Sequence, residues 1–373
     1  MLDKILLFPY YLTLKARNSF YNKPGRKVYT PSVPSVNIGN VTVGGTGKTP
    51  HVEMIVRMLE ESVEWSGKQL AVLSLGYKRE SRGFQQVDLK GGALMFGDEP
   101  VQMKRKFPEL VVAVDKDRVE GCKLLEDPSR LGNKKVARKC WNREFPAADY
   151  IILDDAYQYR KIKAAKNVVL VDYNRPVTKD SLLPFGRLRD LPERIYDADA
   201  VIVSKCPEDL EPEGRTAFLE VLGLESYDPE TCTAVNPKGE RQLVFFTCIK
   251  YCYPKGVYEE TEPRYVFSKK VVLITGIAKD TPLRDYLSNT YKIIKHYNLP
   301  DHHKFTWSDI NRLNEVIRKN PVAAIATTEK DAQRFRDFNG MPKEIIERML
   351  MVPIKADFLT DHEKEVFRRF IVF

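Results

Sequence analysis

A glycine-rich stretch, VNIGNVTVGGTGKTPHV at residues 37–53, restricts the possible fold more than any other feature of the chain. An apolar run precedes its glycines and helical spacing resumes after them, which is the strand, loop and helix order of a phosphate-binding loop. The loop matches the pattern G-x-x-x-x-G-K-[ST] except that Thr42 stands at the first glycine position. The remaining glycines still permit the positive φ values that turn successive amide N–H groups toward an anion. We therefore predict a nucleotide-binding loop.

The residue types in and near this loop indicate ATP and Mg²⁺. Lys48 would reach the β- and γ-phosphates, Thr49 would ligate Mg²⁺, and the following helix would point its positive end at the phosphates. The metal also needs a carboxylate from the end of a neighbouring strand, and the stretch DYIILDDAYQYRK supplies Asp154 and Asp155. The predicted nucleotide contacts are Thr42, Val43, Gly44, Gly45, Thr46, Gly47, Lys48 and Thr49.

Apolar runs alternate with helical patterns along the first part of the chain. Such alternation predicts an α/β fold, here a P-loop NTPase-like parallel sheet with helices on both faces. We expect strands at Ser35 to Ile38, Gln69 to Ser74, Leu110 to Ala113, Tyr150 to Leu153, Asn167 to Asp172 and Ala200 to Ser204. We expect helices at His51 to Glu61, Glu99 to Lys106 and Arg118 to Leu125.

A length of 373 residues favours more than one domain. The composition changes between Pro207 and Lys269, around the β-rich run RQLVFFTCIKYCY, and a second α/β pattern begins at KKVVLITGIAKDTPL. We predict an N-terminal membrane-interface helix at 1–30, a P-loop kinase core at 31–240, and a smaller C-terminal α/β lobe with a hinge ribbon at 241–373.

The first forty residues hold six lysines and arginines but only Asp3 as an acid, in a chain of net charge +9. The apolar run Ile5 to Leu14 contains Pro9 and is too short to span a bilayer, and no small-x-small cleavage site follows it. The pattern indicates an amphipathic helix lying on an anionic membrane surface, and a helix packed on its own domain is the alternative. No aromatic-interleaved basic groove suggests nucleic acid, and no obligatory protein partner is evident.

Two segments hold residue types that suit a phosphate acceptor site. Asp98 lies in MFGDEPVQM, and PDHHKFT contains His302 and His303. Transfer to an alcohol needs a group that accepts the hydroxyl proton, and a carboxylate oriented by an imidazole is suited to this role. A pair of this kind drawn from opposite lobes would meet only when the cleft closes. The stretch TTEKDAQRF is predicted to be structural, with Thr328 capping a helix.

Taken together, these stretches resemble the tetraacyldisaccharide 4'-kinases, or lipid A 4'-kinases, of Gram-negative bacteria. The resemblance is carried, in family order, by GNVTVGGTGKTP, LSLGYKRESRG, GDEP, VDKDRVEG, LDDAYQYRK, LLPFGRLRD, PDHHKFT and TTEKDA. It implies transfer of the γ-phosphate of ATP to the 4'-hydroxyl of a tetraacylated glucosamine disaccharide 1-phosphate, at the cytoplasmic face of the inner membrane.

The resemblance also implies roles for individual residues. Asp98 would accept the proton with help from His302, Lys48 and Thr49 would serve the nucleotide, and Asp154 and Asp155 would hold Mg²⁺. Family positions near the reacting groups, predicted to bind substrate, are Tyr77, Arg118, Gln158, Arg189 and Asp190. The chain departs from the family pattern with Leu75 in place of arginine, Tyr159 in place of histidine and Asp190 in place of glutamate, which affects details of substrate contact.

Three functions other than a kinase are compatible with a glycine-rich nucleotide-binding loop. A partition-type regulatory ATPase would need a lysine where Val43 stands, and a GTPase would need an aspartate that VIVSKCPED lacks at the right offset. A membrane-docked nucleotide-binding scaffold stays open on composition alone. The six cysteines are scattered along the chain, which favours free thiols in a reducing cytosol and argues against a disulfide framework or a metal site. They are Cys122, Cys140, Cys206, Cys232, Cys248 and Cys252.

Overall fold

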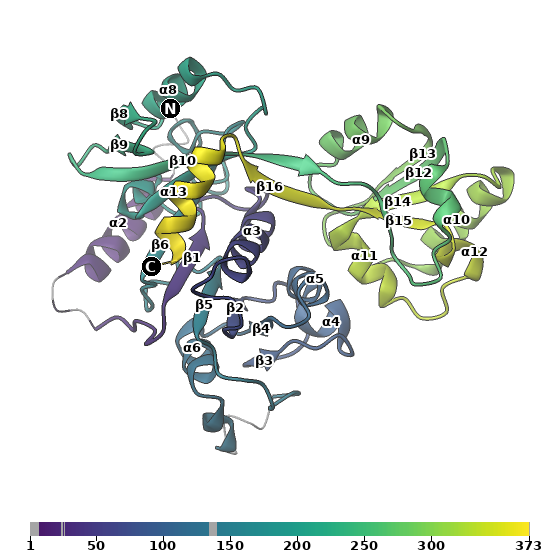
Figure 1. The fold of residues 1–373 in the computed structure, drawn as a ribbon, viewed down its shortest axis with the longest axis horizontal. Coiled ribbons are helices and arrows are strands. Elements are labelled where there is room, and N and C mark those ends of the chain that lie inside the picture. Colours follow the sequence, from purple (N-terminus) through teal and green to yellow (C-terminus); the bar gives the residue numbers. More distant parts are fainter. Residues whose placement is uncertain (1–6, 24, 26, 134–139, 373) are drawn as a thin grey trace.

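The computed structural model describes residues 7–23, 25, 27–133 and 140–372, which form two lobes (Figure 1). The larger lobe is built on a sheet of eleven strands among these residues, in the order β3-β4-β2-β5-β1-β6-β7-β10-β9-β8 with β16 beside β10. The strands are β1 (Ser35–Gly39), β2 (Leu70–Ser74), β3 (Gln85–Gln86), β4 (Val111–Val114), β5 (Tyr150–Asp154), β6 (Lys166–Asp172), β7 (Ala200–Ser204), β8 (Glu225–Asp228), β9 (Thr233–Val235), β10 (Arg241–Tyr251) and β16 (Ile354–Phe358).

The middle of this sheet, from β4 to β10, is parallel, and antiparallel strands pair at its edges. Helices cover both faces because the strands are apolar on both sides. For example, the consecutive residues Ile151 and Ile152 of β5 point to opposite faces and pack into separate hydrophobic cores. The lobe's helices are α2 (Phe8–Asn22), α3 (Lys48–Glu60), α4 (Gly92–Phe96), α5 (Asp98–Lys106), α6 (Arg118–Glu126), α8 (Pro212–Val221) and α13 (Asp361–Val372), with the 3₁₀ turns η1 (Pro128–Gly132), η2 (Val177–Lys179) and η3 (Pro192–Asp197). This architecture confirms the predicted fold class.

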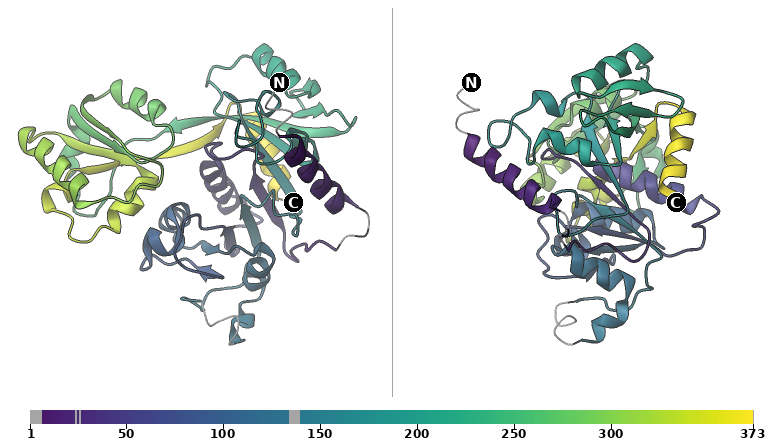
Figure 2. Two further views of the ribbon diagram at one scale, coloured as in Figure 1. Left: turned by 180° about the vertical axis from the view of Figure 1, so that it is seen from behind. Right: turned by 90° about the vertical axis from the view of Figure 1, so that its left-hand side faces the viewer.

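The smaller lobe has a five-stranded sheet in the order β11-β15-β14-β12-β13. Its elements are β11 (Lys255–Gly256), η4 (Pro263–Phe267), β12 (Lys270–Thr275), α9 (Thr281–Ser288), β13 (Lys292–Asn298), α10 (Trp307–Lys319), β14 (Ala324–Thr328), α11 (Glu329–Arg336), α12 (Lys343–Ile346) and β15 (Met349–Val352). Figures 1 and 2 show this lobe projecting from the larger sheet on the paired strands β10 and β16. These two strands form an antiparallel ribbon between the lobes, and β10 lies in the region where the composition change predicts a hinge or ribbon.

The structure differs from the predicted division at residue 241 in one respect. Both ribbon strands pair within the larger sheet, and α13 packs there as well, with Phe367 and Ile371 in the core beneath α3. The chain thus leaves the larger lobe along β10 and returns to it along β16. The range 241–373 consequently contains the smaller lobe together with two closing elements of the larger one.

Helix α2 lies against the larger lobe on one face and exposes apolar side chains on the other. Leu14 and Asn18 are buried, whereas Phe8, Leu12 and Phe20 are exposed. Among the described residues, no helix is both long and apolar enough to cross a membrane.

Candidate active site

The phosphate-binding loop follows β1 in the middle of the parallel sheet. Gly44, Gly45 and Gly47 have φ angles of 66°, 70° and 83°, a left-handed conformation that side chains with a Cβ adopt at a cost. Gly47 is the N-cap of α3, so the loop opens at the positive end of that helix. Lys48 and Thr49 are the first residues of the helix, as the motif predicts.

Polar groups from a neighbouring strand and from connecting segments hold the loop in place. Asn40 Nδ2 donates to Thr46 Oγ1 at 2.7 Å, and the hydroxyl of Ser204, at the end of β7, donates to the Thr46 carbonyl at 2.9 Å. The Val43 N–H donates to the carbonyl of Arg187 at 2.8 Å. The loop is therefore fixed by the side chain of Asn40, which directly follows β1, by Ser204 of β7 and by the segment that carries Arg187 and Arg189.

The two predicted metal-binding carboxylates lie beside the loop because β5 pairs in parallel with β1. Lys48 Nζ lies 3.7 Å from Asp155 Oδ2, and the Ser74 hydroxyl donates to Asp154 Oδ2 at 3.0 Å. Burial and the neighbouring Asp155 raise the pKa of Asp154 to about 6. Burial also opposes ionisation of Asp155, but Lys48 and Arg189 outweigh it and lower the pKa of that carboxyl.

Three of the predicted substrate residues gather around these carboxylates. Arg189 forms an ion pair with Asp155 and donates to Asn40 Oδ1 at 2.6 Å. Gln158 donates to the carbonyl of Asn40. Arg118 is buried and directs its guanidinium toward the carbonyl of Asp154 at 3.4 Å, and burial lowers its pKa. Their present contacts organise the loop and the carboxylates.

Asp190 lies apart from this group, fully buried beneath α2. Its oxygens accept from Arg17 Nη2 at 2.8 Å and from Asn18 Nδ2 at 3.0 Å. A carboxylate so enclosed cannot touch a substrate without releasing α2, so this geometry supports an anchoring role in place of the substrate contact predicted for it. Arg17 and Asn18 were not singled out from the sequence, since their burial depends on which face of the helix meets the domain.

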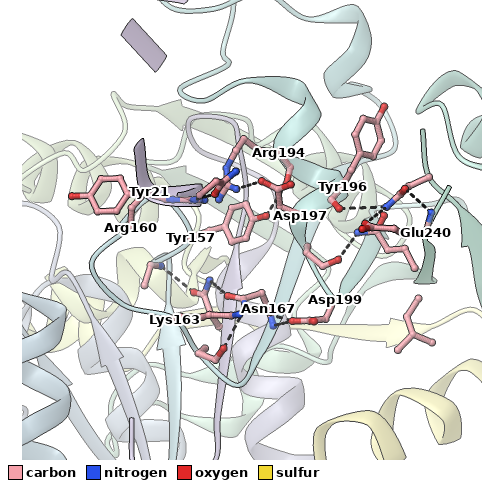
Figure 3. Close-up of a pocket in the computed structure, with 18 of the residues that line it drawn as sticks. Tyr21, Tyr157, Arg160, Lys163, Asn167, Arg194, Tyr196, Asp197, Asp199 and Glu240 are labelled. Atoms are coloured by element: carbon pink, nitrogen blue, oxygen red, sulfur yellow. Dashed lines mark hydrogen bonds and ion pairs between the residues drawn. The ribbon is translucent and has the colours of Figure 1, made fainter. Parts of the chain in front are cut away.

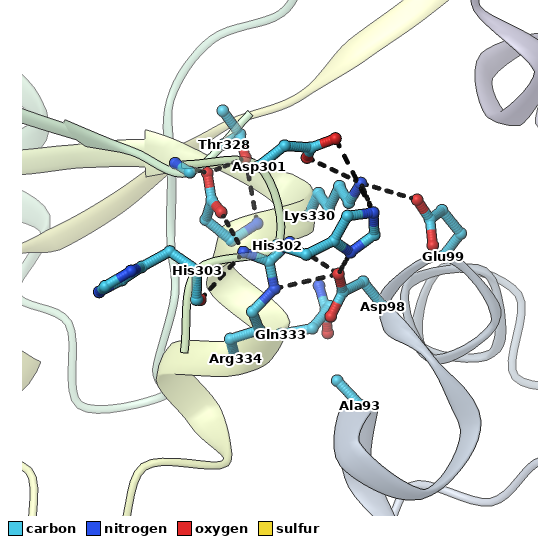
Figure 4. Close-up of polar contacts among 12 residues, drawn as sticks. Ala93, Asp98, Glu99, Asp301, His302, His303, Thr328, Lys330, Gln333 and Arg334 are labelled. Atoms are coloured by element: carbon cyan, nitrogen blue, oxygen red, sulfur yellow. Dashed lines mark hydrogen bonds and ion pairs between the residues drawn. The ribbon is translucent and has the colours of Figure 1, made fainter. Parts of the chain in front are cut away.

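The other two predicted catalytic residues, Asp98 and His302, contact each other across the two lobes (Figure 4). Asp98 is the first residue of α5 in the larger lobe, and His302 lies in the loop after β13 in the smaller lobe. His302 Nδ1 lies 2.9 Å from Asp98 Oδ2, and both side chains are largely buried. The imidazole also faces the ring of Tyr77, with centroids 5.1 Å apart. His303 turns elsewhere, to Asp309 at 2.9 Å.

His302 has a φ of 61°, which is unusual for a residue with a side chain. Its backbone N–H donates to the Gly276 carbonyl at 3.1 Å, and Asp331 of α11 accepts from the N–H of Gly276 at 3.0 Å. The surrounding hydrogen bonds thus hold this loop in a strained conformation that aims the imidazole at Asp98.

Two residues that the sequence reading missed complete the contact. Arg334 donates to Asp98 Oδ2 from Nη2 at 2.6 Å and from Nε at 3.0 Å. Lys330 lies 2.9 Å from Glu99 and 3.0 Å from His302 Nε2. Both belong to TTEKDAQRF, where Thr328 does cap α11 as predicted. Helical spacing could have revealed them, because residues 330 and 334 are four apart and therefore lie on one face of the helix.

These donors decide the charge of Asp98. Burial alone would raise the pKa of this carboxyl, but hydrogen bonds from His302 and Arg334 outweigh burial and lower it below its usual range. Asp98 is therefore ionised at neutral pH. All its described side-chain hydrogen bonds end on Oδ2, so Oδ1 is the oxygen available to a hydroxyl.

The dyad lies at the same edge of the sheet as the phosphate-binding loop. Ser74 ends β2 and donates to Asp154, and two residues later Gly76 packs against Gly97, where a Cβ on Gly97 would lie 3.3 Å from the Gly76 backbone. Asp98 follows directly. This close backbone approach, which requires glycine, holds α5 beside the carboxyl ends of β2 and β5.

A cavity of about 850 Å³ lies elsewhere in the larger lobe (Figure 3). It runs between the end of α2, the connection after β5 and the connection before β7, and neither the loop residues 42–49 nor the dyad line it. Its walls include Tyr157, Arg160, Arg194 and Asp197. Much of this charge is neutralised in place, since Arg194 and Asp197 form an ion pair.

Comparison with known proteins identifies the family. The family model described as "Tetraacyldisaccharide-1-P 4'-kinase" matches residues 4–371. The chain belongs to the tetraacyldisaccharide 4'-kinase family. Membership confirms the predicted enzyme class: an ATP-dependent kinase that phosphorylates the 4'-hydroxyl of a tetraacyldisaccharide 1-phosphate in lipid A biosynthesis.

Relatives of this 4'-kinase family member match it over most of their length. The tetraacyldisaccharide 4'-kinase of Parabacteroides distasonis is 34% identical over 373 residues, covering 98% of this chain and 92% of that protein. The enzyme of the same name from Phocaeicola vulgatus is 35% identical over 342 residues, covering 89% of this chain and 83% of that protein. The fold is similar to that of LpxK from Aquifex aeolicus, solved in complex with ATP, with a TM-score of 0.69, 24% identity and 100% coverage of both chains.

Proposed function

We propose that the 4'-kinase reaction takes place at the edge of the sheet where loop 42–49 meets the Asp98–His302 dyad. The observation that carries this proposal is the 2.9 Å contact between Asp98 and His302, because it joins an acceptor carboxylate to an imidazole of the other lobe. The triphosphate of ATP would lie against the amides of the loop, with the ammonium group of Lys48 near its β- and γ-phosphates.

The residues beside the loop fit Mg²⁺. Asp154 Oδ1 is buried and has no hydrogen-bond partner among the described residues, and its neighbour Asp155 adds to the burial that raises its pKa. A divalent cation would relieve both conditions. We therefore propose that Thr49, Asp154 and Asp155 hold the metal, which would supply neutralisation of charge on the β- and γ-phosphates.

Asp98 would receive the 4'-hydroxyl of the lipid at its free oxygen, Oδ1. Its lowered pKa makes it a weak base. A weak base suffices here, since phosphoryl transfer passes through a loose transition state in which the acceptor hydroxyl needs orientation more than early deprotonation. His302 and Arg334 would keep the carboxylate ionised and fixed, and closure of the lobes around it would exclude water that could otherwise consume ATP.

The substrate is a lipid that lies in a membrane, and α2 has an exposed apolar face that could contact this membrane. Its exposed side chains include Phe8, Leu12 and Phe20, with Lys15 and Lys23 nearby, a composition that suits the interface of an anionic membrane. We propose a peripheral position at the cytoplasmic face of a bacterial inner membrane. Replacing all three apolar residues by serine should abolish sedimentation with anionic vesicles. Val63→Ser, which removes an exposed apolar side chain elsewhere, serves as the control and should not; equal binding by both variants would contradict the role of α2.

The catalytic proposal is tested by separating nucleotide binding from transfer. The protein is incubated with Mg²⁺-ATP and the disaccharide 1-phosphate lipid, and the bisphosphorylated product is quantified. Asp98→Asn, which keeps the shape of the side chain, should lower kcat at least about a hundredfold with ATP affinity retained. Lys48→Ala should weaken ATP binding itself. Equal loss of transfer and of ATP affinity in Asp98→Asn would return Asp98 to a structural role.

A further inference from the structure

A histidine that none of the preceding roles uses lies directly beneath the phosphate-binding loop. His51 is on α3 and is completely buried. Its Nδ1 lies 2.7 Å from the carbonyl oxygen of Gly47, and its Nε2 lies 2.8 Å from the hydroxyl of Thr247 on β10. Its ring therefore bridges the loop and the strand that leads into the smaller lobe.

These two partners decide which ring nitrogen carries the proton. A carbonyl oxygen can only accept, so Nδ1 must be the N–H that donates to Gly47. Nε2 then holds a lone pair and accepts from the Thr247 hydroxyl, whose other acceptor, the carbonyl of Val203, is more distant at 3.5 Å. The opposite tautomer would set the lone pair of Nδ1 against the carbonyl of Gly47 at 2.7 Å. The Gly47 carbonyl thus selects the tautomer, and the Thr247 hydroxyl satisfies the lone pair that this tautomer leaves on Nε2.

The contact with Gly47 bears on the amide that follows it. The peptide between Gly47 and Lys48 is planar and trans, so its N–H points opposite to its C=O. The carbonyl is fixed by His51 Nδ1 and by the His51 backbone N–H at 3.3 Å. The N–H of Lys48 is thereby directed away from α3, toward the open side of the loop where an anion binds a helix N-terminus.

We propose that His51 is a positioning residue of the nucleotide site, which orients the Gly47–Lys48 peptide toward the triphosphate, and that the hydrogen bond from Thr247 to Nε2 holds the imidazole ring in place. Because Thr247 lies on β10, the strand that leads to the smaller lobe also supports the phosphate-binding loop through His51. The inference rests on the proposed role of loop 42–49 in binding ATP.

The test compares pairs of variants that differ in one hydrogen bond. In His51→Asn the amide nitrogen lies as many bonds from the backbone as Nδ1 does, so it keeps the donor to Gly47. In His51→Gln the amide lies at the distance of Nε2 and loses that donor. Thr247→Val removes the hydroxyl while keeping the shape, and Thr247→Ser keeps the hydroxyl. The Kd of Mg²⁺-ATP is measured by titration calorimetry, and folding is verified by thermal unfolding.

We expect Thr247→Val and His51→Gln to raise the Kd about five- to tenfold, because each loses one buried hydrogen bond. Thr247→Ser and His51→Asn keep that bond, so their Kd should stay within about twofold of the wild type. Equal affinity within the Thr247 pair, or within the His51 pair, would overturn the inference. Lys48→Ala separates this failure from that of the proposed function: if it binds ATP as tightly as the wild type, the loop itself is not the nucleotide site, and both proposals fall.

Discussion

Arg334 offers the most direct test of how the two lobes share the charge of Asp98. Its guanidinium donates to Asp98 Oδ2 at 2.6 Å and 3.0 Å, and both side chains are less than a tenth exposed. Replacing it by methionine keeps an unbranched apolar side chain and removes both donors and the charge. Asp98 would then keep one described side-chain partner, His302.

The expected magnitude follows from the bonds that are lost. A hydrogen bond to a charged group contributes about 1.5–3 kcal/mol, and one pKa unit corresponds to about 1.4 kcal/mol. If Arg334→Met costs the ionised form one such contribution, the pKa of Asp98 should rise by about 1–2 units. In the proposed mechanism Asp98 acts in its ionised form, and its pKa is lowered in the wild type. Activity should therefore persist in mildly acidic solution in the wild type and decline there in the variant.

The assay is the pH dependence of kcat/KM between about pH 4.5 and 8, measured with saturating Mg²⁺. The acid limb of Arg334→Met should move upward by about 1–2 pH units relative to the wild type. Arg336→Met is the matched control, since Arg336 lies on the same helix but donates to the carbonyl of Val257 at 2.8 Å. Superimposable acid limbs for Arg334→Met and the wild type, or an equal displacement in Arg336→Met, would refute the assignment.

Three further predictions concern the core of the larger lobe. The raised pKa of Asp154, about 6 through burial and the adjacent carboxylate, means that its contribution to stability is present below pH 3.8 and lost as pH rises through 6. Without metal, the melting temperature should therefore fall as the pH rises from 3.8 to 6. The fall should be smaller with Mg²⁺ present or in Asp154→Asn. If Asp154→Asn showed the same pH dependence as the wild type, the prediction would be wrong. A Cβ on Gly39 would lie 2.4 Å from Tyr157 Cβ, so Gly39→Ala should lower the free energy of unfolding by about 1–3 kcal/mol in denaturant titrations. An unchanged free energy of unfolding would contradict this. Asp190→Ala should speed proteolysis of α2 and raise KM for the lipid no more than Leu14→Ala does; a much larger KM effect would restore the substrate role of Asp190.

The secondary structure near the loop was predictable because local patterns determine it. The predicted strand Ala200 to Ser204 coincides with β7, and the helix expected from Arg118 to Leu125 ends one residue later in the structure. Buried parallel strands are continuous apolar runs with polar ends, so their limits are visible in the sequence. Helix α3 begins three residues before its predicted start because a glycine N-cap leaves no side-chain signal.

The return of the chain to the larger lobe was not predictable in the same way. Strand β16 and helix α13 follow the smaller lobe without a change of composition, and only their pairing with β10 and packing under α3 reveal where they belong. Strand order is a long-range property, whereas a sequence reading divides the chain where local composition changes. A boundary at residue 241 therefore separated β10 from the sheet that contains it.

The candidate site shows the same contrast between local and distant information. Asp154 and Asp155 could be expected beside the loop, since the carboxyl ends of neighbouring parallel strands share one edge. The approach of Asp98 to His302 was a hypothesis about chemistry that spacing could not test. Arg334 and Lys330 were not predicted because the cap at Thr328 accounted for the helix that contains them. Their partners lie on the opposite lobe, and local sequence gives no information about such distant contacts.

The contacts that form the dyad also join the two lobes, so the pairing of Asp98 with His302 depends on the arrangement of the lobes. Lys106 of α5 bridges Glu53 at 2.7 Å and Glu329 of α11 at 3.0 Å, beside the pair of Arg334 with Asp98. Charged pairs that are largely buried are screened weakly by salt but are costly to leave unpaired. Separation of the two lobes would expose these groups to water and would break the contact between His302 and Asp98. On the proposed role of Asp98, its carboxylate would be oriented for the lipid hydroxyl only while the lobes are in contact, which would disfavour hydrolysis of ATP before that hydroxyl arrives.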